Sequence, residues 1–246
     1  MFGVTFSNLD YNSIVRLTED SISNDEKISI GYVNPHTVRY ASKNNILKEN
    51  INSFTYNHID GKGMEIACRI FFPHDDFKRL NWTDEAKKYL KQSEESEWKI
   101  FFLGSDEQTI TTAIKKIKSD FPELKIAGHL NGFEDINDST VKKINESTAN
   151  ILWVGLGSLR QEKWIVDNIN SLNCNVIQSV GDLFGSLAGK RFRGPVLFQK
   201  LGLEWMFRLI QHPIKYFDRY AIGVPVFFFM ILKQILSRND KSISND

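Results

Sequence analysis

An aspartate directly follows an apolar run in the segment Asp60-Gly61-Lys62-Gly63. If that run is a strand of an α/β sheet, the carboxylate lies where such sheets bind ligands, and the glycines allow a close approach of the backbone. A carboxylate in that position can act as a general base on a hydroxyl group. The alternative is a strand-to-helix turn in which Asp60 caps the next helix, and the tetrapeptide alone does not separate the two interpretations.

A second segment, GLGSLRQE at 155–162, also leaves an apolar run and opens a helical pattern. Exposed N–H groups at a helix start bind phosphate well. Gly155 and Gly157 match half of a dinucleotide fingerprint, but Arg160 stands at the third glycine position, which disfavours NAD. Gln161 and Glu162 are expected in the first helical turn, facing a ligand. Alternatively, Glu162 only complements the helix dipole.

A third segment, GDLFGSLAGKR, begins at Gly181. It is not a Walker A loop, because only three residues separate Gly185 from Gly189 and no Ser or Thr follows Lys190. Binding of a nucleotide base or phosphate and a loop without function remain equally open for this segment.

Basic and aromatic residues alternate near the C-terminus, where nine Lys/Arg stand against four Asp/Glu from residue 191 onward. Guanidinium groups suit a pyrophosphate, and aromatic rings suit a lipid interface or a core. The alternative is a solvated basic face, and the spacing among apolar residues disfavours nucleic acid. The basic candidates are Arg191, Arg193, Arg208, Lys215 and Arg219.

The longest apolar run, 221–232, has 12 residues, fewer than the ~20 that a spanning helix needs. Three consecutive phenylalanines at 227–229 cannot share one helical face, which favours contact with lipid or with a partner subunit. We therefore expect a protein that touches a membrane surface without crossing it. A homo-oligomer stays open.

Metal and cofactor chemistry have little support in this sequence. The five histidines are scattered without an HxxxH pair, and no Asp-x-Asp occurs. Cys68 and Cys174 are isolated, as is typical of a reducing cytosol. The first ten residues lack the basic and apolar regions of a secretion signal. We therefore predict a cytoplasmic protein with no metal site and no cofactor.

Strand-like runs alternate with helical patterns over most of the chain. Most of the runs are apolar on both faces, as in a buried parallel sheet. This alternation predicts an α/β fold, a Rossmann-like three-layer sandwich with a parallel-rich sheet, over residues 1–194. A helical appendage broken by Pro213 and Pro225 follows at 195–236, and a disordered polar tail at 237–246. The expected strands are 27–33, 53–59, 98–104, 124–128, 151–155 and 176–180; the expected helices are 35–49, 63–72, 83–91, 106–121 (N-cap Asp106), 138–147 (N-cap Asp138) and 160–172.

The order of these segments resembles the WecG/TagA/CpsF family of glycosyltransferases (glycosyltransferase family 26), from about residue 27 to residue 220. The three most specific pieces are ILWVGLGSLRQEKWI, SVGDLFGSLAGKRFRGP and LGLEWMFRLIQHPIKYFDRY. Further matches are YVNPHTVRYA, IDGKGMEIACR, FFLGSDEQTI and DFPELKIAGHLNGF.

The resemblance implies an inverting, metal-independent transfer from a UDP-sugar to an undecaprenyl-pyrophosphate-linked sugar at the inner face of the plasma membrane. The sugar would be N-acetylmannosamine, its uronic acid or glucose, used for surface polysaccharide. Asp60 corresponds to the family's catalytic base, and Gln161 and Glu162 to its substrate-contacting pair. The implied substrate-binding residues are Tyr32, Asn34, Gly61, Gly155, Gly157, Gln161, Glu162, Gly181, Arg191, Arg208, Lys215 and Arg219.

Five places depart from the family pattern. Tyr32 replaces a threonine, Leu159 a proline, Gly185 an aspartate and Lys215 an arginine. The segment LNWTD at 80–84 stands where the family has a glycine-containing turn. A catalytically silent homologue that scaffolds glycan assembly at a membrane is therefore the alternative to an enzyme. A nucleotide-sugar oxidoreductase would need a full glycine fingerprint and a ribose-binding acid, and the sequence has neither.

Overall fold

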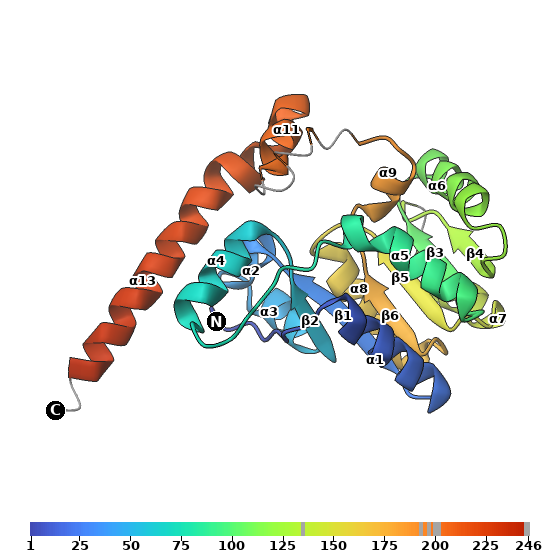
Figure 1. Ribbon diagram of the computed structural model, residues 1–246, viewed down its shortest axis with the longest axis horizontal. Helices are drawn as coiled ribbons and strands as arrows, with labels where there is room; N and C mark the ends of the chain where they lie inside the picture. Colours follow the sequence, from blue (N-terminus) through green and yellow to red (C-terminus); the bar gives the residue numbers. More distant parts are fainter. Residues whose placement is uncertain (134–135, 192–193, 196–197, 199–202, 244–246) are drawn as a thin grey trace.

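The computed structural model describes residues 1–133, 136–191, 194–195, 198 and 203–243 (Figure 1). Each expected strand is present. The strands are β1 (Ile28–Val33), β2 (Tyr56–Ile59), β3 (Ile100–Gly104), β4 (Ile126–Leu130), β5 (Ile151–Gly155) and β6 (Val176–Ser179). The helices of the sheet domain are α1 (Tyr11–Ser23), α2 (Pro35–Ala41), α3 (Asn45–Asn52), α4 (Lys62–Phe71), α5 (Trp82–Glu95), α6 (Glu107–Asp120), α7 (Asp138–Glu146), α8 (Arg160–Asn168), the 3₁₀ turn η1 (Ile169–Ser171) and α9 (Leu183–Leu187).

The six strands form one sheet in the order β2-β1-β6-β5-β3-β4, and every pair is parallel. All carboxyl ends of the strands therefore lie along one edge. The predicted parallel-rich α/β class is confirmed. Parallel strands need crossover connections, which the intervening helices provide.

Two hydrophobic clusters cover opposite faces of the sheet, because successive strand residues point to opposite sides. Ile151 and Trp153 of β5 join a cluster with helices α1, α5, α6 and α9. Leu152 and Val154 join the cluster that includes residues of α7 and α8. Because helices cover both faces of the sheet, the strand sequences are nearly continuous apolar runs. These runs made the strands recognisable in the sequence.

Several helices differ from the predicted ones. Helix α1 was not predicted, α5 extends to Glu95 instead of ending at 91, and α8 ends at Asn168 instead of 172. The single helix expected at 35–49 is two helices, because the Asn44 side chain accepts a hydrogen bond from the backbone N–H of Leu47 and starts α3. The N-cap of α7 is Asn137, whose side chain binds the backbone N–H of Ser139, and the predicted cap Asp138 is the first helical residue. The predicted N-cap Asp106 of α6 is confirmed.

The appendage consists of α11 (Glu204–Gln211), α12 (Pro213–Tyr216), the π-helical stretch η2 (Phe217–Ile222) and α13 (Gly223–Ile243). Pro213 begins α12, as the predicted break requires. The predicted break at Pro225 is wrong, because η2 and α13 run on continuously through this residue. Helix α13 also continues through Ile243, into the segment 237–246 that was predicted to be disordered.

Helix α13 lies along the side of the molecule and is packed against α2 and α4 on one side only (Figure 1). Phe227 and Ile231 are buried there, whereas Phe228, Phe229, Leu232 and Leu236 are exposed. The prediction that the three phenylalanines divide between faces is confirmed. The helical stretch Phe217–Ser237 is also long and apolar enough to span a membrane, by length and composition alone. The apolar run at 221–232 therefore underestimated the length of this apolar helix.

Candidate active site

A cavity of about 820 Å³ lies at the carboxyl edge of the sheet, between the sheet domain and the appendage. Residues that follow all six strands line it, as expected for an α/β sheet. The appendage closes the opposite wall. Of the predicted site residues, the cavity wall includes Tyr32, Asn34, Asp60, Gly61, Gly155, Gly157, Gly181, Arg191, Arg208 and Arg219.

Asp60 stands directly after β2, with its backbone N–H bound to the carbonyl of Val33. It does not cap the following helix. The N-cap of α4 is Gly61, at φ 84°, and no side chain caps this helix. The alternative interpretation of Asp60 as a capping residue is therefore wrong. Among the described residues, no hydrogen bond or ion pair engages the Asp60 carboxylate, which faces the cavity.

Gln161 and Glu162 occupy the first turn of α8, as predicted, but protein encloses both side chains. The Glu162 carboxylate accepts hydrogen bonds from the backbone N–H of Leu159 and from the amide of Gln161. Burial raises the pKa of Glu162 above its ordinary value. Glu162 thus serves the helix start, and neither side chain forms part of the described cavity wall.

Tyr32 brings β1 into contact with this helix start. Its hydroxyl lies 3.1 Å from the Gln161 amide nitrogen and 3.2 Å from the Ser158 hydroxyl. Burial, and after it the charge of Glu162, raises the pKa of Tyr32 to about 12, so the phenol is neutral. Tyr32 is one of the residues that differ from the family pattern, and its hydroxyl lies close to the segments that follow β5 and β6.

Asn34 and the glycines shape the wall in different ways. The side-chain oxygen of Asn34 accepts a hydrogen bond from the backbone N–H of Thr37 and caps α2. This oxygen is therefore engaged in the helix cap. A side chain at Gly155 would meet the Phe184 ring at 2.5 Å, so only glycine fits there. Gly157 has φ 83° and open space around its Cα, which leaves its backbone accessible from the cavity.

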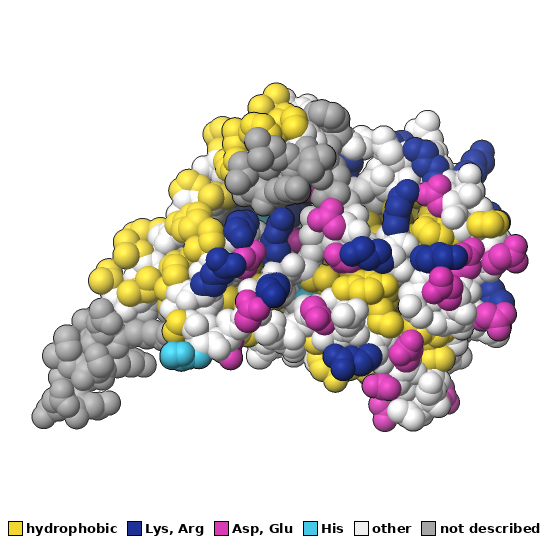
Figure 2. All heavy atoms as spheres, in the orientation of Figure 1, with side chains coloured by type: hydrophobic (Ala, Val, Ile, Leu, Met, Phe, Trp, Pro, Cys, Tyr) yellow, Lys and Arg dark blue, Asp and Glu magenta, His cyan; other side chains and the backbone are white. Residues whose placement is uncertain are grey.

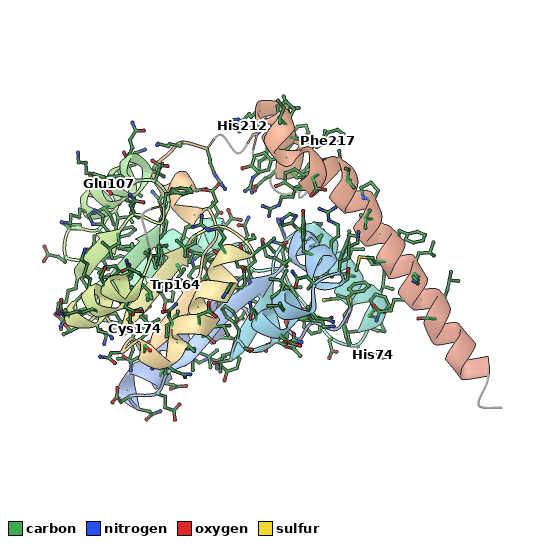
Figure 3. The ribbon with its side chains drawn as sticks, turned by 180° about the vertical axis from the view of Figure 1, so that it is seen from behind. His74, Glu107, Trp164, Cys174, His212 and Phe217 are labelled. Atoms are coloured by element: carbon green, nitrogen blue, oxygen red, sulfur yellow. The ribbon has the colours of Figure 1, made fainter. Side chains whose placement is uncertain are left out.

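Cations gather on the appendage side of the cavity. Arg191 forms an ion pair with Asp182, and burial and then the charge of Arg208 lower the pKa of Arg191 to about 10. Arg208 lies 3.7 Å from Glu204, and Arg219 lies over the Tyr220 ring. Arg193 and the side chain of Lys215 lie outside the described residues, although the backbone of Lys215 belongs to α12. Figure 3 labels His212 and Phe217, which flank α12 on either side.

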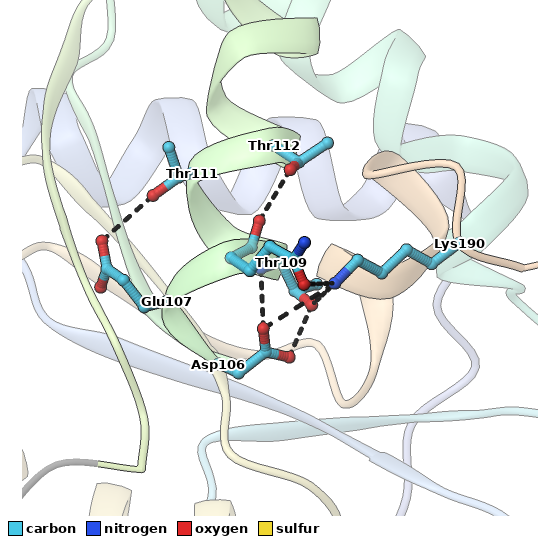
Figure 4. A network of polar contacts seen from close by, with 7 residues as sticks. Asp106, Glu107, Thr109, Thr111, Thr112 and Lys190 are labelled. Atoms are coloured by element: carbon cyan, nitrogen blue, oxygen red, sulfur yellow. Dashed lines mark hydrogen bonds and ion pairs between the residues drawn. The ribbon is translucent and has the colours of Figure 1, made fainter.

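The structure adds wall residues that were not among the predicted site residues. His36 has a pKa lowered to about 4, first by burial and then by the charges of Arg219 and Arg39. Phe133 exposes its ring beside the Arg160 guanidinium. Lys190 donates to the Thr109 hydroxyl (2.7 Å) and lies 3.8 Å from Asp106, the N-cap residue of α6 (Figure 4). These residues are far apart in the sequence. Only the short motifs that contain them could have suggested that they line a site.

The fold is that of an α/β protein with a ligand cavity at the carboxyl edge of a parallel sheet. The cavity wall carries the Asp60 carboxylate on the sheet side and a group of arginines on the appendage side. Such a site suits an anionic ligand and the deprotonation of a hydroxyl. A model of the glycosyl transferase WecG/TagA/CpsF family matches residues 1–241, and the chain belongs to that family. It is a glycosyltransferase.

Similar proteins from three strains of Staphylococcus aureus carry a more specific name. The proteins of strains MW2, NCTC 8325 / PS 47 and COL are each 28% identical to this chain over 241 residues. The matches cover 95% of this chain and 91% of each relative. All three are named N-acetylglucosaminyldiphosphoundecaprenol N-acetyl-beta-D-mannosaminyltransferase.

Proposed function

We propose that this protein transfers a sugar from a UDP-sugar to an undecaprenyl-diphosphate-linked sugar, with inversion and without a metal, in the synthesis of a bacterial surface polysaccharide. The names of the relatives support this acceptor class and make N-acetylmannosamine the first donor sugar to test. Its uronic acid and glucose follow as further donor sugars.

The observation that carries the proposal is the state of the carboxylates around the cavity. Asp106 binds the first turn of α6, Asp182 pairs with Arg191, and Glu204 lies beside Arg208. Asp60 differs from these three, because none of the described residues binds its carboxylate. An uncommitted carboxylate can accept the proton of the attacking hydroxyl, which typically accelerates transfer ~10²–10⁴-fold.

In a direct displacement, the acceptor oxygen forms a bond to the anomeric carbon while the bond to the UDP oxygen breaks on the opposite face. The acceptor proton passes to Asp60, and the electron pair leaves with UDP. Arg191, Arg208 and Arg219 offer cations to the departing diphosphate from the other wall. One base without a protein nucleophile leads to inversion at the anomeric carbon.

Metal independence stays a prediction, supported by the choice of residues around the cavity. Among the described residues, no group of three or more His, Cys, Asp or Glu side chains could hold a metal ion. Cationic side chains of the cavity wall, the three arginines among them, are available to neutralise a diphosphate. Activity in the presence of EDTA would be the direct consequence.

The acceptor is carried by a lipid, so the enzyme must work at a membrane surface. The exposed apolar side of α13 and the side chains of Ile210 and Ile214 provide a surface for that contact (Figure 2). We infer peripheral attachment at the cytoplasmic face, where nucleotide sugars are available. Burial of Phe227 and Ile231 against the sheet domain supports lateral packing of this helix over insertion across the bilayer.

The test is UDP release by purified protein in the presence of EDTA, with a panel of UDP-sugars and a short-chain polyprenyl-diphosphate-linked N-acetylglucosamine. Release that depends on the acceptor, with one donor, and a β-linked product from an α-linked donor would support every element of the proposal. Folded protein that binds UDP but releases none with any donor would favour the scaffold alternative.

A further inference from the structure

The Gln161 side chain is completely buried, at 0% exposure, and uses all its polar atoms. Its carbonyl oxygen accepts the backbone N–H of Gly181 at 3.0 Å. Its nitrogen donates to the Tyr32 hydroxyl oxygen at 3.1 Å and to the Glu162 carboxylate at 3.0 Å. One amide thus connects the ends of β1 and β6 with the start of α8.

These partners allow only one orientation of the amide. The backbone N–H of Gly181 can only donate, so the Gln161 carbonyl must face it. A rotated amide would place its nitrogen against that N–H and its oxygen against the Glu162 carboxylate. The donor direction from Gln161 to Tyr32 therefore follows from fixed backbone and carboxylate chemistry.

This direction decides where the Tyr32 proton points. Because Gln161 donates to the Tyr32 oxygen, the hydroxyl hydrogen of Tyr32 must point elsewhere. It can reach the Ser158 hydroxyl, whose own hydrogen is then directed onward, or an acceptor within the cavity. In both cases the Tyr32–Ser158 pair presents a hydrogen-bond donor to the cavity.

The surroundings of Tyr32 indicate which acceptor fits. Tyr32 lines the same cavity as Asp60 and Arg219, and the charges of both residues affect the pKa of its hydroxyl. Ser158 follows Gly157 at the start of α8, on the same wall. A side chain at Gly181 would come within 2.6 Å of the Tyr32 oxygen, so glycine leaves the space that this hydroxyl occupies.

We propose that Gln161 is a positioning residue that turns the hydroxyl of Tyr32, directly or through Ser158, toward a diphosphate oxygen of the bound sugar nucleotide. This proposal rests on the proposed function, since it assigns a contact to the same donor. Gln161 does not touch the ligand and acts only through Tyr32. A neutral donor aimed at the oxygen that gains charge assists departure of the diphosphate.

The test is a double-mutant cycle of Tyr32→Phe and Gln161→Met, with calorimetric titration of UDP and of uridine. Loss of one hydrogen bond to a charged group should weaken UDP binding by roughly 10- to 100-fold in Tyr32→Phe. Binding of uridine, which lacks the diphosphate, should change less than about twofold. Gln161→Met should weaken UDP binding in the native background but cause no further loss in Tyr32→Phe.

Several outcomes would overturn the relay alone. Gln161→Met weakening UDP binding equally in both backgrounds would show a merely structural role, and equal losses for UDP and uridine would place the hydroxyl elsewhere. If Gln161→Met does not fold, Gln161→Glu is the second variant. Its carboxylate still accepts the hydrogen bond from Gly181 and turns the hydroxyl hydrogen of Tyr32 toward residue 161, so it should reproduce the loss of UDP affinity. No UDP binding by the native protein would instead overturn the proposed function.

Tyr89→Phe is the matched control for this experiment. It removes another buried tyrosine hydroxyl, one that lies 2.8 Å from Thr18 in the hydrophobic cluster of α1 and α5. Its UDP affinity should equal that of the native protein.

Discussion

Arg39 of α2 and Asp218 of η2 form a buried-to-surface ion pair that attaches the appendage to the sheet domain. The Arg39 side chain is largely enclosed, and the Tyr40 hydroxyl donates to the same carboxylate at 2.9 Å. The hydrogen bond from Arg39, followed by that from Tyr40, keeps the pKa of Asp218 below its ordinary value. The pair lies next to His36 on the cavity wall, so the position of the appendage and the shape of the site depend on each other.

We expect Asp218→Asn to loosen the appendage, because it removes the charge that Arg39 and Tyr40 bind. The Asp218 carboxylate is half exposed, so the free energy that holds the appendage in place should fall by about 1 kcal/mol. This corresponds to roughly fivefold faster limited proteolysis within 212–223. Turnover should fall as well. Asp167→Asn is the control, since it removes an exposed ion pair on α8 with Lys163. Equal protection of native protein and Asp218→Asn would show that this pair does not hold the appendage.

Asp60→Asn should lower kcat by about 10²–10⁴-fold, because the amide cannot accept the proton of the attacking hydroxyl. UDP affinity should stay within about twofold, since the arginines that face the diphosphate are unchanged. Rates and calorimetric titration would be compared with Asp120→Asn, a surface carboxylate paired with Lys87. An active Asp60→Asn protein would mean that another group, or solvent, takes the proton.

The exposed side of α13 should bind lipid. Phe229→Ser combined with Leu232→Ser removes two side chains from that side, where Phe229 is 66% exposed. We expect co-sedimentation with anionic vesicles to fall about tenfold or more, given the ~1.5–3 kcal/mol gained by burying each side chain. Ile46→Ser, on exposed α3, is the control and should bind normally. Unchanged binding of the double variant would mean that other residues contact the membrane.

His36 should make stability depend on pH. Its pKa falls from 6.5 to about 4 on folding, first because of burial and then because of Arg219 and Arg39. A depressed histidine pKa means that its contribution is complete above pH 6.5 and is lost as the pH falls through 4. Urea unfolding between pH 7.5 and 4 should therefore show a shallower decline in His36→Gln than in native protein.

The exposed His74 provides the comparison for this titration, since it lies in a loop after α4, far from the appendage residues labelled in Figure 3. His74→Gln should follow the native pH profile. If His36→Gln declined as steeply as native protein over this interval, other groups would have to account for the loss.

Much of the fold could be predicted because strands buried on both faces leave continuous apolar runs. All six strands coincide with such runs, and Asp60, Gly155 and Gly181 could be placed at the carboxyl edge because they stand at or just after the strand ends. Helix boundaries were harder. Asn44 and Asn137 act as caps through local side-chain bonds, and nearby polar residues looked equally suitable in the sequence.

The sequence by itself determined the α/β class, the family and the identity of the residues at the strand ends, because these depend on local periodicity and short motifs. Only the tertiary structure decided which side chains face the ligand. Gln161 and Glu162 stand beside Ser158 in the chain, yet burial directs them toward Tyr32, Gly181 and the start of α8. The contact of Gln161 with Tyr32 joins residues more than a hundred positions apart, as the pair of Arg39 and Asp218 also does, and no local pattern encodes contacts over that separation.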